Sequence, residues 1–216
     1  MLQRGSTRAG LLSLAAAILM APAARAGTAN HGVGIGATRD TAVFAGGCFW
    51  GVQAVFARVK GVTSSISGYA GGHVANPSYE DVSSGETGHA ESVRVIYDPA
   101  VVSYDQLLTV FFAVAHDPTE LNYQGPDHGT QYRSAIFFRS PAQQRAATAF
   151  IARLTQAKRY SRPIVTQVAP LGAFYPAEAY HQNFFDTHPT YPYIVINDKP
   201  KVEHLREQFP DLYVAR

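Results

Sequence analysis

The stretch AVFAGGCFWG, residues 42–51, holds the single cysteine and the single tryptophan of this 216-residue chain. Its first half is typical of a short strand, and a helix is predicted to begin near residue 48. Gly46 and Gly47 permit a tight turn between the two elements. Cys48 is therefore expected at a helix N-terminus, where free amides and the helix dipole favour the nucleophilic thiolate. The alternative is core packing, because free cysteine is among the most buried residue types.

The rest of the chain mixes short strands and amphipathic helices without strict alternation. Strands are predicted near residues 41–45, 62–68, 92–97, 132–138 and 164–169, and helices near 48–58, 104–115, 142–157, 177–187 and 200–208. Ser103 is a candidate helix N-cap, and Ser140 followed by Pro141 indicates another helix start. We therefore expect one α/β (α+β) sandwich domain over residues 41–216, with helices packed against a mixed sheet.

The N-terminus has a different composition. Two arginines precede an apolar run over residues 10–24, which ends in the small-x-small sequence ARA at 24–26. This pattern predicts a secretory signal peptide over residues 1–26, followed by a flexible, Gly-rich lead-in over 27–40. A membrane anchor is the alternative, but the run is shorter than the ~20 residues of a spanning helix and contains a proline. We therefore expect export, with a bacterial periplasm as the destination.

Export would change both the net charge of the chain and the role that we expect for its single cysteine. Residues 1–26 contain three arginines and no acidic residue, so their removal changes the formal net charge from +2 to −1. The mature chain then offers no electrostatic reason to bind nucleic acid or an anionic membrane. A single cysteine in an exported protein has no intrachain partner, which favours a reactive thiol over a structural one.

Four further stretches combine glycine, tyrosine, histidine and acidic residues. They are GYAGGHVANPSYEDV (68–82), SGETGHAESV (84–93), HDPTELNYQGPDHGTQYRS (116–134) and FYPAEAYHQNFF (174–185). Together with GGCFWG, in this order and spacing, they resemble the A type of peptide methionine sulfoxide reductase. The resemblance extends from about Thr41 to about Phe209. It implies an oxidoreductase that reduces methionine-(S)-sulfoxide, free or in oxidised proteins, to methionine.

The resemblance also implies a mechanism. The Cys48 thiolate would attack the electrophilic sulfoxide sulfur and become a sulfenic acid as methionine leaves. Glu91 matches the acid of the GHAE motif; in an apolar site its pKa would rise, so that it could protonate the oxygen. Taken alone, a glutamate is more often a solvated surface residue.

Five residues match the substrate-binding positions of that family. Phe49 and Trp50 would enclose the methyl group of the substrate, although on sequence alone they could equally be core aromatics. Tyr79 and Tyr132 would donate hydrogen bonds to the sulfoxide oxygen, because a phenol remains protonated near neutral pH. Asp127 would help to order the site, whereas an isolated aspartate in the GPDHG loop would be interpreted as a turn former.

The histidines do not indicate a metal centre. Four of them lie in the motifs, but none has HxxxH or Cys/His ligand spacing. We therefore predict no metal and no bound cofactor. His181 is expected to line the site, and His116 to support a turn.

The chain departs from many relatives in its cysteines. Those relatives carry further cysteines that attack the sulfenic acid, whereas here Ser83 and Ser84 occupy one such segment and the C-terminal tail has none. We therefore expect an external thiol, either a thioredoxin-like protein or a small molecule, to complete the cycle.

Two other functions remain compatible with the sequence. Cys48 could pair with a histidine in a hydrolase, which an ester or peptide substrate would detect. The protein could also bind oxidised methionine without reducing it, in which case replacing Cys48 by serine would leave its function intact.

Overall fold

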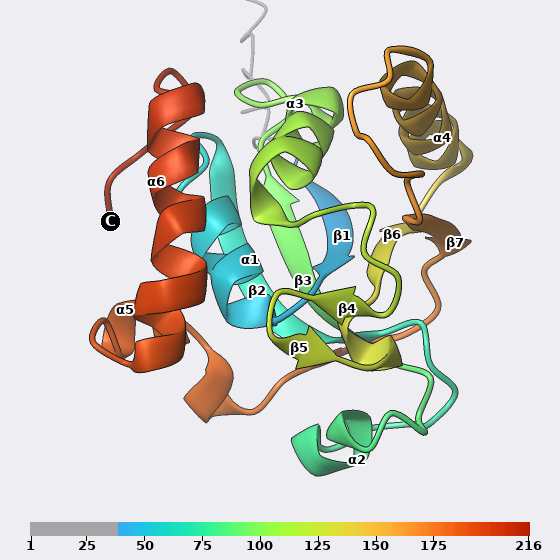
Figure 1. Ribbon diagram of the computed structural model, residues 1–216, viewed down its shortest axis with the longest axis vertical. Coiled ribbons are helices and arrows are strands. Elements are labelled where there is room, and N and C mark those ends of the chain that lie inside the picture. The colour runs from blue at the N-terminus through green and yellow to red at the C-terminus, as the bar shows by residue number, and fades with distance from the viewer. Residues whose placement is uncertain (1–38) are drawn as a thin grey trace, which may run out of the picture. The chain divides into compact units, whose positions relative to one another are not determined.

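The strand that leads to Cys48, β1 (Asp40–Gly46), lies inside a six-stranded sheet (Figure 1). The structure is a computed structural model and describes residues 39–216. The strand order is β7-β6-β1-β3-β2-β8, in which the other strands are β2 (Val62–Ala70), β3 (Ala90–Tyr97), β6 (Ser134–Phe138), β7 (Gln167–Pro170) and β8 (Phe174–Pro176). Within this sheet β6 and β7 pair in parallel and the other neighbours are antiparallel, so the sheet is mixed, as predicted.

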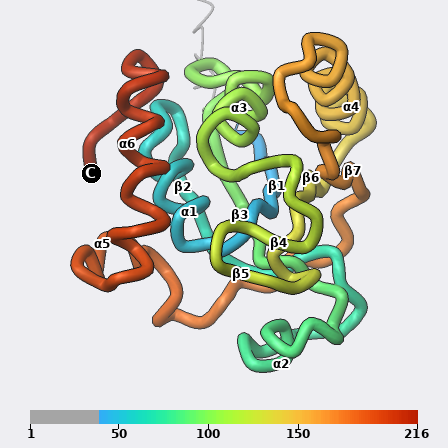
Figure 2. The backbone as a smooth tube through the Cα atoms, in the orientation of Figure 1, coloured from blue at the N-terminus to red at the C-terminus, as the bar shows by residue number. Residues whose placement is uncertain are grey.

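Helices cover the sheet, and two of them lie side by side although they are far apart in sequence. The helices are α1 (Phe49–Ala57), α2 (Tyr79–Ser83), α3 (Tyr104–Val110), α4 (Pro141–Gln156), α5 (Phe184–Thr187) and α6 (Lys199–Gln208). A π-helical turn over Phe111–Ala115 continues α3, and another over Ile194–Asp198 leads directly into α6. α6, at the C-terminal end of the colour scale, runs beside α1 in Figure 2.

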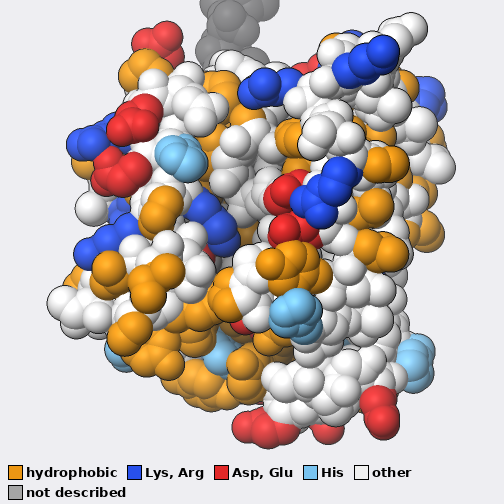
Figure 3. All heavy atoms as spheres, viewed as in Figure 1, with side chains coloured by type: hydrophobic (Ala, Val, Ile, Leu, Met, Phe, Trp, Pro, Cys, Tyr) orange, Lys and Arg blue, Asp and Glu red, His pale blue; other side chains and the backbone are white. Residues whose placement is uncertain are grey.

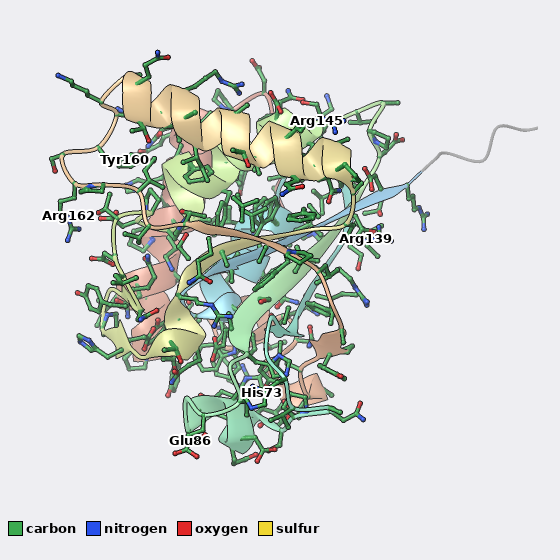
Figure 4. The ribbon with its side chains drawn as sticks, turned by 90° about the vertical axis from the view of Figure 1, so that its right-hand side faces the viewer. His73, Glu86, Arg139, Arg145, Tyr160 and Arg162 are labelled. Atoms are coloured by element: carbon green, nitrogen blue, oxygen red, sulfur yellow. The ribbon has the colours of Figure 1, made fainter. Side chains whose placement is uncertain are left out.

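The main core lies between β1 and the helices on one face of the sheet. The ring of Phe44 stacks between those of Phe56 and Phe111, with centroid distances of 5.0 and 4.8 Å. All three rings are fully buried, which contributes about 1.5–3 kcal/mol for each side chain. A smaller cluster around Val43 and Phe137 lies against the segment that follows β7, which crosses the sheet in Figure 4.

Local sequence signals explain where the helices start. Ser103 caps α3: its Oγ accepts from the Gln106 N–H, while the Gln106 side chain accepts from the Ser103 N–H. Ser140 caps α4 through the Gln143 N–H, and Pro141 occupies the first turn. Both predicted starts are confirmed.

The predicted helix over 177–187 is wrong in extent. The chain forms a short 3₁₀ turn over Ala179–His181 and then α5, and Asn183 between them is left-handed with φ +55°. The cause is non-local, because Gln53 Oε1 on α1 accepts a 2.8 Å hydrogen bond from the Asn183 N–H. The last predicted strand begins later than expected, at Gln167. Helix α2, strand β8 and the hairpin of β4 (Tyr123–Gln124) and β5 (Asp127–His128) were not predicted.

The expected signal peptide over residues 1–26, and the lead-in as far as residue 38, lie outside the described residues. None of the helices between residues 39 and 216 is both long enough and apolar enough to cross a bilayer.

Candidate active site

Cys48 is the N-cap residue of α1, directly after β1, as the sequence predicts. Both preceding glycines are required. Gly47 has φ +83°, and a Cβ there would lie 2.5 Å from the Gln124 side chain. A Cβ on Gly46 would lie 3.0 Å from the His116 ring. The turn therefore places the thiol at the start of a helix in a closely packed setting, where Cys48 is only 8% exposed.

The expectation that the helix start leaves Cys48 as a thiolate is wrong for the resting site. Burial raises the pKa of the thiol well above its ordinary value, and the carboxylates of Glu91 and Asp198 raise it further. The Trp50 N–H and the Lys201 ammonium lower the pKa, but less strongly. Desolvation outweighs the helix start, so Cys48 rests as a thiol.

Glu91 lies at the second position of β3 and is 3% exposed. The Phe49 N–H donates a 3.0 Å hydrogen bond to Glu91 Oε2 and so holds the carboxyl group against the first turn of α1. Burial raises the pKa of Glu91 from its ordinary 4.5 to about 8, and the charges of Asp127 and Asp198 add to the shift. At neutral pH Glu91 is therefore mainly a carboxylic acid, next to the residue that follows the thiol.

Phe49 and Trp50 build an apolar wall beside Cys48. Phe49 is 1% exposed, and its ring centroid lies 5.0 Å from that of His181. Trp50 is partly buried and stacks on Phe184 at 3.9 Å, with the edge of Tyr191 against it. Hydrophobic side chains also gather beside α5 on the surface in Figure 3. Phe49 is thus a core residue as well as a wall of the site, whereas Trp50 extends the wall toward solvent.

Tyr79 and Tyr132 reach the same site from two separate segments. Tyr79 begins α2, where its N–H donates to Glu178 Oε1 at 2.9 Å, and Tyr132 ends the 3₁₀ turn Thr130–Tyr132. Burial raises the pKa of both phenols, and the charges of Glu91 and Cys48 raise them further. Both side chains therefore remain protonated hydrogen-bond donors.

Asp127 is held by a residue that the sequence analysis missed. The Tyr193 hydroxyl donates to Asp127 Oδ2, and the Tyr193 ring packs edge-on against Trp50. Burial raises the pKa of Tyr193, and Cys48 contributes to that shift. Tyr193 is one of 12 tyrosines in the chain and lies in no motif that singles it out.

The motif histidines are structural neighbours of the site. His181 Nδ1 accepts a 3.1 Å hydrogen bond from Trp50 Nε1, and burial lowers the pKa of His181, so the ring is neutral. His116 is fixed between Phe111 O and Ser134 Oγ at 3.0 and 2.7 Å. No histidine between residues 39 and 216 hydrogen bonds to Cys48, as a Cys–His hydrolase would require. In the same part of the chain, no three His, Cys, Asp or Glu side chains lie close enough together to hold a metal ion.

The structure thus brings all seven predicted site residues into one region: three come from the start of α1 and the others from four further segments. The family model described as peptide methionine sulfoxide reductase matches residues 40–213. The chain is therefore an oxidoreductase, and it belongs to the peptide methionine sulfoxide reductase family.

The curated relatives narrow this to the A type. The chain is 58% identical to peptide methionine sulfoxide reductase MsrA 2 of Mesorhizobium japonicum over 174 residues, which cover 81% of this chain and 89% of that protein. A Synechocystis protein with the same name is 49% identical over 177 residues, covering 82% and 83% of the two chains.

Solved structures agree with this assignment. The reduced form of Mxr1 from Saccharomyces cerevisiae matches with a TM-score of 0.66 and 34% identity, over 72% of this chain and 89% of that one. Methionine sulfoxide reductase A of Corynebacterium diphtheriae matches with a TM-score of 0.63 and 35% identity, over 71% and 76%. These similarities confirm the predicted fold class.

Proposed function

We propose that this protein reduces methionine-(S)-sulfoxide, free or in oxidised proteins, with Cys48 as the nucleophile and Glu91 as the general acid. The observation that carries the proposal is the hydrogen bond from the Phe49 N–H to Glu91, which holds a buried, protonated carboxyl group beside the single thiol of the chain. A sulfoxide needs both groups, because its sulfur must be attacked while its oxygen is protonated.

The sulfoxide is expected to lie between the apolar wall and the phenols. Phe49 and Trp50 would contact the methyl group, while Tyr79 and Tyr132 would donate hydrogen bonds to the oxygen. Asp127, which accepts a hydrogen bond from the Tyr193 hydroxyl, would help to order the site. These interactions distinguish the methyl group from the oxygen, which is what selection of one sulfoxide epimer requires.

The chemical step balances within the site. Cys48 Sγ bonds to the sulfoxide sulfur as Glu91 gives its proton to the oxygen, and the Glu91 carboxylate recovers the proton of the thiol. The oxygen then passes to Sγ, and both the original S–O bond and the bond between Sγ and the methionine sulfur break. The sulfoxide is reduced by two electrons to methionine, and Cys48 is oxidised to a sulfenic acid. Because the resting cysteine is a thiol, its activation depends on this proton exchange.

An external thiol would complete the cycle, since the chain has no second cysteine. A thiol R–SH attacks the sulfenic sulfur, which gives a mixed disulfide and water, and a second thiol releases Cys48 and the disulfide R–S–S–R. A thioredoxin-like protein could supply both thiols, and a small thiol could act twice. No bound cofactor is needed for this sequence.

We also propose that the protein repairs oxidised proteins in an exported compartment. The supporting observation is the signal-peptide pattern of residues 1–26. The test is expression of the full chain in a bacterial host, followed by fractionation and intact mass measurement. A periplasmic product that begins at Gly27 is expected, and an uncleaved protein in the membrane or cytoplasmic fraction would contradict the proposal.

The reductase proposal is tested with both epimers of methionine sulfoxide and dithiothreitol as the reductant. Methionine should form from the S epimer and not from the R epimer, and Cys48→Ser should abolish turnover. An unchanged function in that variant would instead support a non-catalytic binding module.

A further inference from the structure

A cavity of ≈ 240 Å³ reaches Cys48 from the side of α6. Cys48 lines it together with Asp117 and Glu120, which follow the π-helical turn after α3, and with Asn197 and Lys201 from the C-terminal helical segment. None of Phe49, Trp50, Tyr79, Glu91 and Tyr132 lines this cavity, whereas Tyr193, which holds Asp127, lines it. Cys48 therefore borders two environments. One is formed by the apolar wall and Glu91, and the other is the cavity with the charged side chains of Glu120 and Lys201.

The two walls of the cavity carry opposite charges. Lys201 Nζ lies 3.2 Å from Asp198 Oδ1 and is partly exposed. On the opposite wall, Glu120 accepts a hydrogen bond from the Gly125 N–H, and its side chain is 15% exposed. Figure 3 shows basic and acidic side chains over α6, with a basic one facing a hollow, and acidic side chains with a basic one against them on the other side of the hollow. A molecule that enters this cavity meets an ammonium on one side and a carboxylate on the other.

Arg162 does not remove this asymmetry. It lies 3.2 Å from Asp117 Oδ2 and 3.9 Å from Glu120 Oε1, and its side chain is 58% exposed. In Figure 4, Arg162 lies at the outer edge of the molecule, in the loop after α4. It therefore interacts mainly with the carboxylate of Asp117, which is the more exposed of the two. Glu120 is left as the main carboxylate that a molecule inside the cavity can contact.

We propose that this cavity binds the reducing substrate, a small thiol that carries an α-amino acid head group. Lys201 would bind the carboxylate of that head group and Glu120 its ammonium, and the thiol would lie against Cys48. The inference rests on the proposed reductase function, whose sulfenic acid is the group that this thiol attacks.

The direction of approach favours this cavity. Displacement at sulfur proceeds in line, with the nucleophile opposite the leaving oxygen. In the proposed reduction the sulfenic oxygen comes from the sulfoxide, so it would lie on the side of Glu91 and the two phenols. A thiol in the cavity beside α6 would attack from a side that Glu91 and the two phenols do not line. The new Sγ–S bond forms as the S–O bond breaks. The sulfenic hydroxyl leaves as water with a proton from Glu91, and the thiol proton passes to solvent, from which the Glu91 carboxylate is reprotonated.

The size of the cavity favours a small molecule. Pockets for drug-sized ligands enclose about 300–1,000 Å³, so ≈ 240 Å³ suits a ligand of amino-acid size. Cys48 is only 8% exposed, which restricts direct access by a thiol on the surface of a folded protein.

The test measures the reductive step alone. The enzyme is mixed with methionine-(S)-sulfoxide in the absence of reductant, and the release of methionine reports whether the oxidised enzyme forms. The oxidised enzyme is then mixed with L-cysteine, cysteamine or 3-mercaptopropionate, and the mixed disulfide at Cys48 is followed by rapid quench and intact mass. The variants are Glu120→Gln and Lys201→Gln, with the exposed Glu86→Gln beside α2 as the control (Figure 4).

The three thiols separate the two charges. Glu120→Gln should lower the rate of mixed-disulfide formation with cysteine and cysteamine about tenfold and leave the rate with 3-mercaptopropionate unchanged. Only the first two thiols carry an ammonium. Lys201→Gln should lower the rate with cysteine and 3-mercaptopropionate about tenfold and leave the rate with cysteamine unchanged, because cysteamine has no carboxylate. Equal effects on all three thiols, or none, would overturn the assignment. A raised KM for methionine sulfoxide in these variants would show instead that the cavity binds the sulfoxide. A failure of the first step, with no methionine released, would refute the reductase proposal and not this one.

Discussion

The Phe49 N–H donates a 3.0 Å hydrogen bond to Glu91 Oε2, and this contact joins the first turn of α1 to the start of β3. The two residues are 42 positions apart in the sequence. The contact fixes the carboxyl group beside the thiol, and burial raises the pKa of Glu91 to about 8. Acid and nucleophile are thus positioned by the same turn.

Replacing Glu91 by glutamine should lower kcat by about 10²–10⁴-fold, the usual contribution of a general acid. In the wild type, kcat should decrease as pH rises through about 8, because Glu91 then loses the proton that it must donate. The measurement is the pH profile of methionine-(S)-sulfoxide reduction by both proteins. A variant with wild-type activity at neutral pH would remove Glu91 from the mechanism.

His116 should make the free energy of unfolding depend on pH below neutrality. Burial lowers the pKa of its ring from an ordinary 6.5 to about 4. Between these values the unfolded chain binds a proton that the folded protein does not, so stability decreases as pH falls from about 6.5 to about 4. Urea unfolding at pH values across this window should show a smaller loss for His116→Gln than for the wild type. The exposed His128→Gln is the matched control, and an identical pH dependence in all three proteins would contradict the prediction.

Gly51 has no room for a side chain. A Cβ there would lie 2.1 Å from Asp198 Oδ1, a carboxylate with no exposed surface. Gly51→Ala should therefore destabilise the protein by about 1–3 kcal/mol, as overpacking of a buried site does. Gly172→Ala is the control, because nothing lies within 4 Å of its Cβ position. Measured by thermal unfolding, Tm should be lower than in the wild type for Gly51→Ala and unchanged for Gly172→Ala. Equal Tm values for the two variants would contradict the packing described for α1 and Asp198.

Trp50 should contribute mainly through its apolar surface. Trp50→Phe keeps a ring against Phe184 but loses the hydrogen bond to His181, whereas Trp50→Ala removes both. We expect the phenylalanine variant to keep kcat/KM within about tenfold, and the alanine variant to lose more, since burial of an aromatic side chain contributes about 1.5–3 kcal/mol. Steady-state kinetics with methionine-(S)-sulfoxide measure both. Equal losses would assign the role to the indole N–H and not to the wall.

The sequence predicts the parts of the fold that depend on local signals. The strand, glycine turn and helix around Cys48 follow from residues close together in the chain, and so do the caps at Ser103 and Ser140. The helix over 177–187 was predicted wrongly because a side chain on α1, Gln53, hydrogen bonds to the backbone of Asn183. No local pattern contains that contact.

The same distinction applies to the site. Glu91 and the tyrosines were identified through motif resemblance, since periodicity alone does not distinguish them from surface residues. Tyr193 and the ion pair of the buried Asp198 with Lys201 were missed because they lie in a stretch without a motif. The protonation of Cys48 was mistaken because the helix start is visible in the sequence, whereas the depth of burial and the charge of Asp198 are not.

The most direct test of the account is one turnover without reductant. Purified protein mixed with excess methionine-(S)-sulfoxide should release one equivalent of methionine per chain, and its intact mass should increase by one oxygen atom, located at Cys48 by peptide mapping. Cys48→Ser should release none. Methionine release without oxidation of Cys48, or no release from a folded wild-type protein, would contradict the claim that this single thiol takes the oxygen.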